Sequence, residues 1–72
     1  MTQNKQVLLW LQKYGTITDI EAYQKFRIRR LSARIYDLKK QGYNIMTEIK
    51  SRKEDGKTYT YAVYYYFGKK VI

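Results

Sequence analysis

The fold is decided by residues 28–43, which read IRRLSARIYDLKKQGY. Three apolar residues, Leu31, Ile35 and Leu38, are spaced so that a helix of about 3.6 residues per turn places them on one side. A glycine after this stripe indicates the end of the helix. The spacing predicts an amphipathic helix over residues 29–41, with a buried stripe and a polar outer side.

Two periodic segments precede this helix. Residues 2–14 have apolar residues on one side and are followed by Gly15, a frequent helix stop. Thr18 and Glu21 have the spacing of a capping box, which predicts a second helix over residues 18–25. The helix-spaced aromatic residues are assigned to the core: Trp10, Tyr14, Tyr23 and Phe26.

The hydrophobic period changes to two after residue 42. Residues 43–53 alternate in polarity, and residues 58–67 are a run of Tyr, Thr and Val. Asp55 and Gly56 lie between the two runs and are typical of a tight turn. This pattern predicts two strands joined as a β-hairpin.

Two registers of the hairpin are open. A two-residue turn pairs Ile49 with Ala62, whereas a three-residue turn with a glycine bulge pairs Ile49 with Tyr61. We prefer the second, because it collects apolar residues on one face: Ile45, Ile49, Tyr61, Val63 and Tyr65. The other face then presents Tyr64 and Tyr66, either as ordinary half-exposed residues or as a surface for a second copy, a protein partner or stacked bases.

The composition limits the chemistry. Seventy-two residues suffice for a single domain over residues 1–72, and 15 Lys and Arg against 6 Asp and Glu leave a net charge of +9, which favours a polyanionic partner. Cys and His are absent, which excludes disulfides, thiolate or imidazole metal sites and His-dependent nucleophiles. No apolar stretch approaches the roughly 20 residues of a membrane span. We expect no enzyme activity, cofactor, metal, small-molecule substrate or membrane contact, and a soluble, cytoplasmic protein.

Three helices followed by a hairpin is the order of elements in a winged helix-turn-helix domain. The sequence also resembles the small helix-turn-helix domains that many bacteriophages and prophages encode, over residues 3–67. The resemblance is carried by Ile17, Thr18, Glu21, Ala22, Ile28, Arg30, Leu31, Ala33, Arg34, Ile35, Asp37, Leu38, Lys39, Gly42, Tyr43 and Ile45. It implies an α+β fold with three helices and a two-stranded wing. It also implies a non-enzymatic phage or prophage regulator that binds double-stranded DNA in the bacterial cytoplasm.

The alternative function is a phage-encoded inhibitor that binds a host or defence protein through its basic face or its tyrosine-rich strand. A homodimer is also open, since a module of this size rarely reads DNA strongly alone.

Two arginines depart from the family pattern. Arg27 stands where similar proteins often have a turn glycine, and Arg29 stands where they have a capping Ser or Thr. Each departure costs stability on the order of 1 kcal/mol. Either the two side chains are placed to bind an anion at the start of a helix, or the joint adopts another conformation and both are solvated.

The basic charge is concentrated on the third helix. Residues 27–41 hold six basic residues against Asp37 alone, a net charge of +5. Arginine forks match the edge of guanine and a small residue allows contact with a thymine methyl, although a merely solvated face is the alternative. The predicted DNA-binding residues of this helix are Arg27, Arg29, Arg30, Ala33, Tyr36 and Lys40. Arg34 is expected to pair with Glu21 or Asp37 instead. The predicted phosphate-binding residues of the wing are Lys50, Arg52, Lys53 and Lys57.

Overall fold

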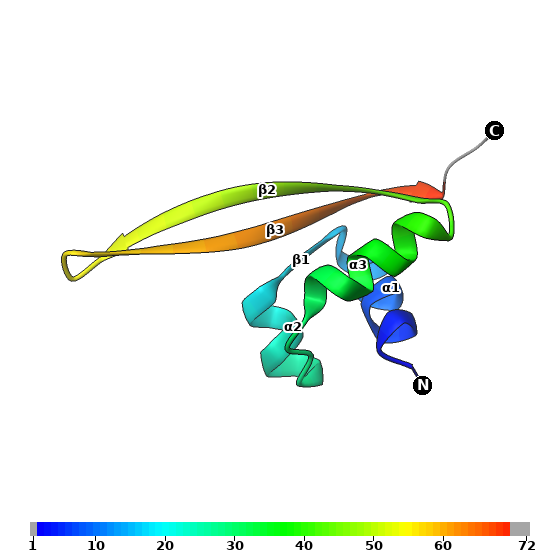
Figure 1. The fold of residues 1–72 in the computed structure, drawn as a ribbon, viewed down its shortest axis with the longest axis horizontal. Helices are drawn as coiled ribbons and strands as arrows, with labels where there is room; N and C mark the ends of the chain where they lie inside the picture. Colours follow the sequence, from blue (N-terminus) through cyan, green and yellow to red (C-terminus); the bar gives the residue numbers. More distant parts are fainter. Residues whose placement is uncertain (1, 70–72) are drawn as a thin grey trace.

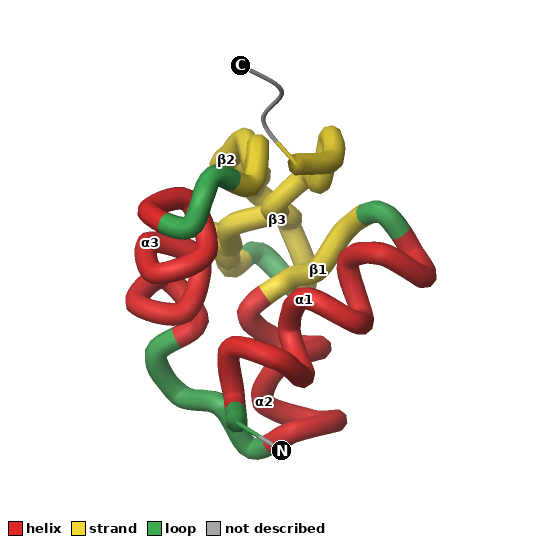
Figure 2. Tube along the Cα trace, turned by 90° about the vertical axis from the view of Figure 1, so that its right-hand side faces the viewer, coloured by secondary structure: helices red, strands yellow, loops and turns green. Residues whose placement is uncertain are grey.

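The computed structural model of the protein describes residues 2–69. Three helices and three strands follow one another (Figure 1): α1 Gln3–Tyr14, β1 Thr16–Thr18, α2 Asp19–Phe26, α3 Leu31–Lys40, β2 Tyr43–Glu54 and β3 Lys57–Lys69. Seen along the long axis, the helices all lie on one side of the sheet (Figure 2). The α+β class and the predicted order of three helices and a hairpin are confirmed.

The core forms where the helices meet the sheet. Leu31, Ile35 and Leu38 of α3 are at most 2% exposed, which confirms the predicted stripe. The other helices and the sheet complete the core with Val7, Leu8, Leu11, Ile17, Ala22, Ile28, Ile45, Ala62 and Tyr64. The helices therefore cover the sheet only at the base of the hairpin.

Two of the four aromatic residues assigned to the core were placed wrongly. Trp10 and Phe26 are half-buried and pack against the core in an edge-to-face pair. Tyr14 and Tyr23 are 55% and 43% exposed. Tyr14 lies in the last turn of α1, where its ring packs against Trp10 at an interplanar angle of 45°, with centroids 4.4 Å apart. Helical spacing alone does not show that the aromatic cluster continues past the edge of the core.

The local signals for α1 and α2 are confirmed. Gly15 caps the end of α1 with a left-handed φ of 84° and donates its amide to the Leu11 carbonyl. At the start of α2 the Glu21 amide donates to Thr18 Oγ1 at 3.1 Å, and the Thr18 amide donates to Glu21 Oε1 at 3.0 Å. This reciprocal capping box satisfies two amides that the helix cannot pair internally.

Replacing Thr18 with alanine is expected to lower the free energy of unfolding by about 0.5–2 kcal/mol, since it removes the N-cap acceptor. Urea unfolding followed by circular dichroism measures the change. Gln24→Ala is the control, because Gln24 is exposed on the same helix and alanine is a better helix former. Equal unfolding midpoints for the two variants would contradict the prediction.

A third strand, which the sequence did not predict, joins the hairpin. β1 pairs antiparallel with β3, so the strand order is β1-β3-β2 and the predicted two-stranded wing is part of a three-stranded sheet. Ile17 is fully buried opposite Tyr64. The Tyr66 amide also donates to the Gly15 carbonyl at 2.9 Å. β1 therefore fastens the base of the hairpin to the helices.

α3 begins at Leu31, later than the predicted start of the helix over residues 29–41. Arg30, and not Arg29 as the family pattern suggested, is its N-cap, with φ −119° and ψ 65°, and no side chain caps the first turn. Arg27 is the C-cap of α2 in a left-handed conformation, with φ 59° and ψ 29°. The chain uses residues 27–30 to leave one helix and turn into the next. Arg29 and Arg30 thus lie in the joint ahead of α3.

The preferred register of the hairpin was wrong. Asp55 and Gly56 form a two-residue turn with φ of 51° and 74°, and Ile49 pairs with Ala62 rather than with Tyr61. Positive φ at both positions is characteristic of the type I′ turn, whose twist matches that of the strands. Because aspartate tolerates the left-handed region, the turn needs no additional bulge residue.

This register exchanges the two faces of β3. Tyr64 is 6% exposed in the core, and Tyr66 is half-buried beside Tyr43 with ring centroids 6.2 Å apart. The prediction that Tyr64 and Tyr66 form an exposed partner surface is therefore wrong. Phe67 on the same strand is instead 63% exposed.

The distal half of the hairpin extends beyond the helices. Figure 1 shows β2 and β3 projecting past α2, and the molecule measures 46 × 26 × 20 Å. Every residue from 51 to 60 is exposed. We call residues 51–60 the arm. Its side chains are available to a ligand rather than to the core.

Candidate nucleic-acid interface

α3 turns its polar side away from the other residues of the described range 2–69. Figure 2 shows α3 at one edge of the helical layer, beside α1. Tyr36 is 60% exposed on α3, and Ala33 is half-buried. The other predicted residues of the helix and its joint are exposed: Arg27, Arg29, Arg30 and Lys40. The structure thus leaves this basic side uncovered.

Arg34 takes a supporting position at the edge of this side. Its Nη2 atom lies 3.5 Å from Asp37 Oδ2, which is one of the two ion pairs that the sequence suggested. Asn4 of α1 donates from Nδ2 to the same oxygen at 3.3 Å. Glu21, the other suggested partner, is used in the capping box. Asp37 therefore links the start of α1 to Arg34 on α3.

Two tyrosines lie next to cations of this region. Lys40 Nζ is 5.1 Å from the ring centroid of Tyr36, one turn before it on α3. Arg27 Cζ is 5.7 Å from the ring centroid of Tyr23. Such cation–π contacts are worth about 0.5–1 kcal/mol at exposed sites. Tyr23, which is not a core residue, thus helps to orient Arg27.

A hollow opens where the joint meets the start of α1. Its volume is about 320 Å³. It is lined by Gln3, Arg27, Arg29, Arg30, Ala33 and Arg34. We call it the arginine hollow. Four of its six lining residues are arginines, and they come from the joint between α2 and α3 and from the first turn of α3.

The four basic residues predicted for the wing lie on two faces of the hairpin. Lys53 pairs with Thr58 and shares a face with Ile49, whereas Lys50, Arg52 and Lys57 lie on the other face. Lys53 and Lys57 are exposed on the arm. The hairpin therefore cannot present all four cations in a single row.

Lys50 lies at the base of the arm among polar neighbours. A side-chain hydrogen bond and the charge of Tyr65 raise the pKa of Lys50, and the Glu48 carboxylate, 3.9 Å away, raises it further. The Lys50 ammonium also lies 6.0 Å from the Tyr65 ring centroid. Lys50 therefore stays protonated to a higher pH than an ordinary lysine.

The sequence matches the model of one protein family, and the geometry described above is consistent with that family. A family model described as a winged helix-turn-helix domain matches residues 2–68. The chain belongs to this family. No curated protein and no solved structure matched it. In the winged helix, α2 and α3 form the helix-turn-helix and the β2–β3 hairpin forms the wing. Winged helix-turn-helix domains are typically DNA-binding and non-enzymatic.

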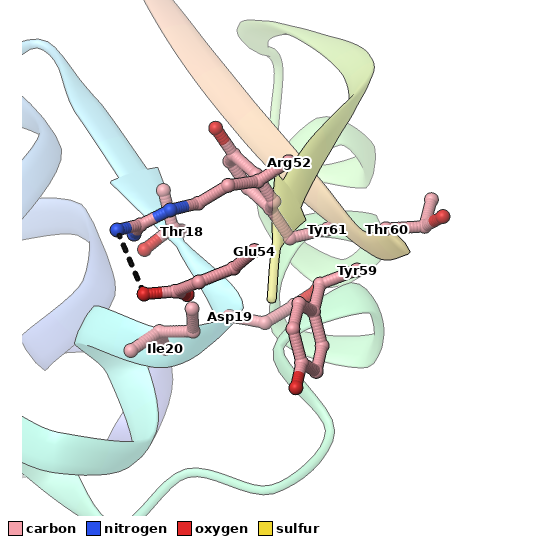
Figure 3. Close-up of a pocket in the computed structure, with 8 residues that line it drawn as sticks. All are labelled: Thr18, Asp19, Ile20, Arg52, Glu54, Tyr59, Thr60 and Tyr61. Carbon is pink, nitrogen blue, oxygen red and sulfur yellow. Dashed lines mark ion pairs between the residues drawn. The ribbon is translucent and has the colours of Figure 1, made fainter. Parts of the chain in front are cut away.

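A second hollow of the winged helix lies between the arm and α2, with a volume of about 560 Å³. Figure 3 shows Arg52 and Glu54 directed from the wing toward the start of α2, joined by an ion pair of 3.6 Å. The hollow is lined by Thr18, Asp19, Ile20, Arg52, Glu54, Tyr59, Thr60 and Tyr61. Two carboxylates accompany its single cation, so this hollow is a poor anion site, unlike the arginine hollow. The Arg52–Glu54 ion pair is exposed and therefore weak, so Arg52 can exchange Glu54 for a phosphate.

Sequence reasoning missed two contributors to the basic side of the winged helix. Arg34 was assigned only to an ion pair, yet it also lines the arginine hollow. Gln3 lines the hollow because α1 packs against α3, and no sequence motif signals that contact.

Within residues 2–69, none of the helices is long and apolar enough to cross a membrane.

Proposed function

We propose that the protein binds double-stranded DNA and reads it with α3. The observation that carries this proposal is the uncovered basic side of α3, opposite an apolar stripe that is at most 2% exposed. A helix exposed in this way fits the major groove, which is about 12 Å wide. The net charge of +9 attracts a polyanion and speeds its association.

The residues on the polar side of α3 suit different parts of a groove. Ala33, near the start of the helix, allows close approach or contact with a thymine methyl. Tyr36 offers a hydroxyl one turn further on, and Lys40 offers a positive charge near the end of the helix. We therefore assign base contacts to Ala33 and Tyr36, and charge contacts to Lys40.

The wing is proposed to hold the DNA backbone. Lys53 and Lys57 are exposed on the arm, and phosphate contact requires only positive charge within reach. Lys50 and Arg52 lie nearer the helices and add to the same field. Glu54 and Asp55 oppose contact at the tip, so the wing is expected to supply affinity rather than sequence preference.

Selection of bound duplexes from a random pool, at two salt concentrations, tests this proposal. We expect one motif to be enriched at both concentrations. Tyr36→Ala should relax the preference at one base pair, by about 1–3 kcal/mol, whereas Lys53→Gln should weaken binding to all sequences and lower the salt slope by about one. Tyr59→Ala, which removes an exposed tyrosine of the arm, is the control for Tyr36. Absence of any complex in dilute buffer would refute DNA binding.

We further propose that the protein is a phage or prophage regulator acting at an operator or recombination site in a bacterial cytoplasm. The support is the resemblance of residues 17–45 to phage-encoded helix-turn-helix domains. The selected motif should then occur in the DNA flanking the gene, and transcription from the adjacent promoter should change when the protein is added. Unchanged transcription and unchanged recombination at such a site would argue against this role.

A second candidate is an inhibitor that binds a host or defence protein. It is favoured by the open face of the sheet, where Met46 and Phe67 are each 63% exposed and border a hollow of about 430 Å³. A specific protein complex should survive nuclease digestion and be lost in the Met46→Asp/Phe67→Asp variant. Loss of the partner on nuclease digestion would instead support DNA binding.

A further inference from the structure

The arginine hollow gathers positive charge without a matching acid. Of the arginines that line it, only Arg34 joins an ion pair within residues 2–69, with Asp37 at 3.5 Å. Arg27, Arg29 and Arg30 face no carboxylate there. Side chains of like charge repel one another when they border one small space. An anion placed in the hollow would remove that repulsion.

The donors around the hollow match a phosphate group. Guanidinium groups present planar, forked N–H donors that bind phosphate oxygens in pairs. Gln3, the first residue of α1, adds a side-chain amide. The start of α3 has no side-chain cap, and the Ala33 amide donates to the Arg30 carbonyl at 3.1 Å, so the amides of Leu31 and Ser32 are open to an acceptor. These residues come from separate elements and border one space.

The chain gives up stability to form this cluster. Arg27 adopts a φ of 59°, a region that glycine enters without steric cost. Arg30 occupies an N-cap position at which Ser, Thr, Asp or Asn would cap the helix. Both costs fall on residues that line the hollow, which is the pattern expected when a binding role outweighs local stability.

We propose that the arginine hollow holds one backbone phosphate of the bound DNA. This inference rests on the proposed function and deepens it, because it assigns Arg27, Arg29 and Arg30 to the phosphate rather than to base edges. Fixing one phosphate at the start of α3 sets the register of that helix in the groove. Base preference is then left to Ala33 and Tyr36.

Titration of the free protein with inorganic phosphate, followed by NMR, tests the hollow without DNA. We expect saturable shifts for Gln3 and the first residues of α3. The Arg29→Gln/Arg30→Gln variant should weaken phosphate binding by about tenfold or more. Lys13→Gln/Lys25→Gln removes the same charge from α1 and α2, beside a different hollow, and should leave the titration unchanged. Shifts that do not saturate, or that the two double variants weaken equally, would overturn the proposal.

Arg27→Gly separates binding from stability. Glycine accepts the left-handed backbone, so the variant should unfold at a higher denaturant concentration than the wild type. It should nevertheless bind phosphate about tenfold more weakly, because one guanidinium is lost. A variant that is stabilised and binds phosphate like the wild type would show that Arg27 has no part in the site.

A duplex carrying the selected motif, with single neutral methylphosphonates at successive positions, identifies the source of the phosphate. A methylphosphonate at one position should weaken binding by the wild type. The same methylphosphonate should not weaken binding by the Arg29→Gln/Arg30→Gln variant any further. If the variant instead loses preference at one base pair, the arginines read bases and the hollow proposal is overturned, while DNA binding stands. If phosphate saturates the hollow but no duplex binds, DNA binding is refuted and the phosphate comes from another ligand.

Discussion

Replacing Leu11 with alanine is expected to lower the free energy of unfolding by about 2–5 kcal/mol. Leu11 is 0% exposed on α1, which contacts α2, α3, β1 and β3. The substitution removes buried methyl groups and leaves a cavity that these elements cannot all close. A domain of this size has a total stability of about 4–11 kcal/mol. The variant should therefore be marginally folded or unfolded at room temperature, as urea titration would show.

Leu9→Ala is the matched control, since Leu9 is 42% exposed on the same helix. Its loss of stability should stay below about 1 kcal/mol, because little buried surface is removed. Equal destabilisation by the two variants would mean that the core is not centred on the inner side of α1. The comparison thus tests the packing of the helices independently of any ligand.

The affinity for duplex DNA is expected to fall by about 10³–10⁵-fold when salt rises from about 50 to about 200 mM, as for proteins with six to ten phosphate contacts. One phosphate in the arginine hollow, one for each of the four wing cations and one for Lys40 of α3 reach the lower end of that number. Each neutralised phosphate releases counterions, so the logarithm of affinity should be linear in the logarithm of salt concentration. Fluorescence anisotropy at four salt concentrations gives the slope.

Charge-matched variants assign that slope to a surface. Lys53→Gln/Lys57→Gln removes two cations of the arm and should lower the slope by about two. Lys13→Gln/Lys25→Gln removes two exposed cations of α1 and α2, which border a different hollow from that of the basic side. This second pair should leave the slope nearly unchanged. The same decrease in both would indicate diffuse attraction without a defined DNA-binding side.

Local signals in the sequence predicted the helices well. The capping box of Thr18 and Glu21, the stop at Gly15 and the stripe of α3 each involve residues within one or two turns of each other. Their physics does not depend on the rest of the chain. The start of α3 was placed too early because the joint uses a left-handed residue, Arg27, which the helical period does not reveal.

Long-range pairing was the part that the sequence could not supply. β1 has only three residues, too few to show a period, and it is a strand because Ile17 meets Tyr64 of β3. The register of the hairpin depended on whether Asp55 accepted a positive φ, and one residue of shift reversed the faces of the tyrosine strand. Apolar matching favoured the wrong register, whereas turn geometry favoured the right one.

The residues of the candidate site also divide into those that local spacing predicts and those that only tertiary packing brings together. The outward residues of α3 follow from its buried stripe, so Tyr36 and Lys40 were found from the sequence. The arginine hollow exists only because the start of α1 packs beside the joint, which brings Gln3 to Arg30. Sequence charge alone indicated a basic helix, but not that its first arginines surround a common space.

The length of the molecule bears on how many copies a DNA site requires. Its long axis of 46 Å exceeds one helical turn of B-form DNA, about 34–36 Å. A single chain laid along the duplex can therefore cover more than ten base pairs, with α3 near one end of the footprint and the hairpin turn near the other. Shorter modules make contacts one helical turn of DNA apart by placing two subunits on repeated half-sites. A single copy of this chain is long enough to make both contacts.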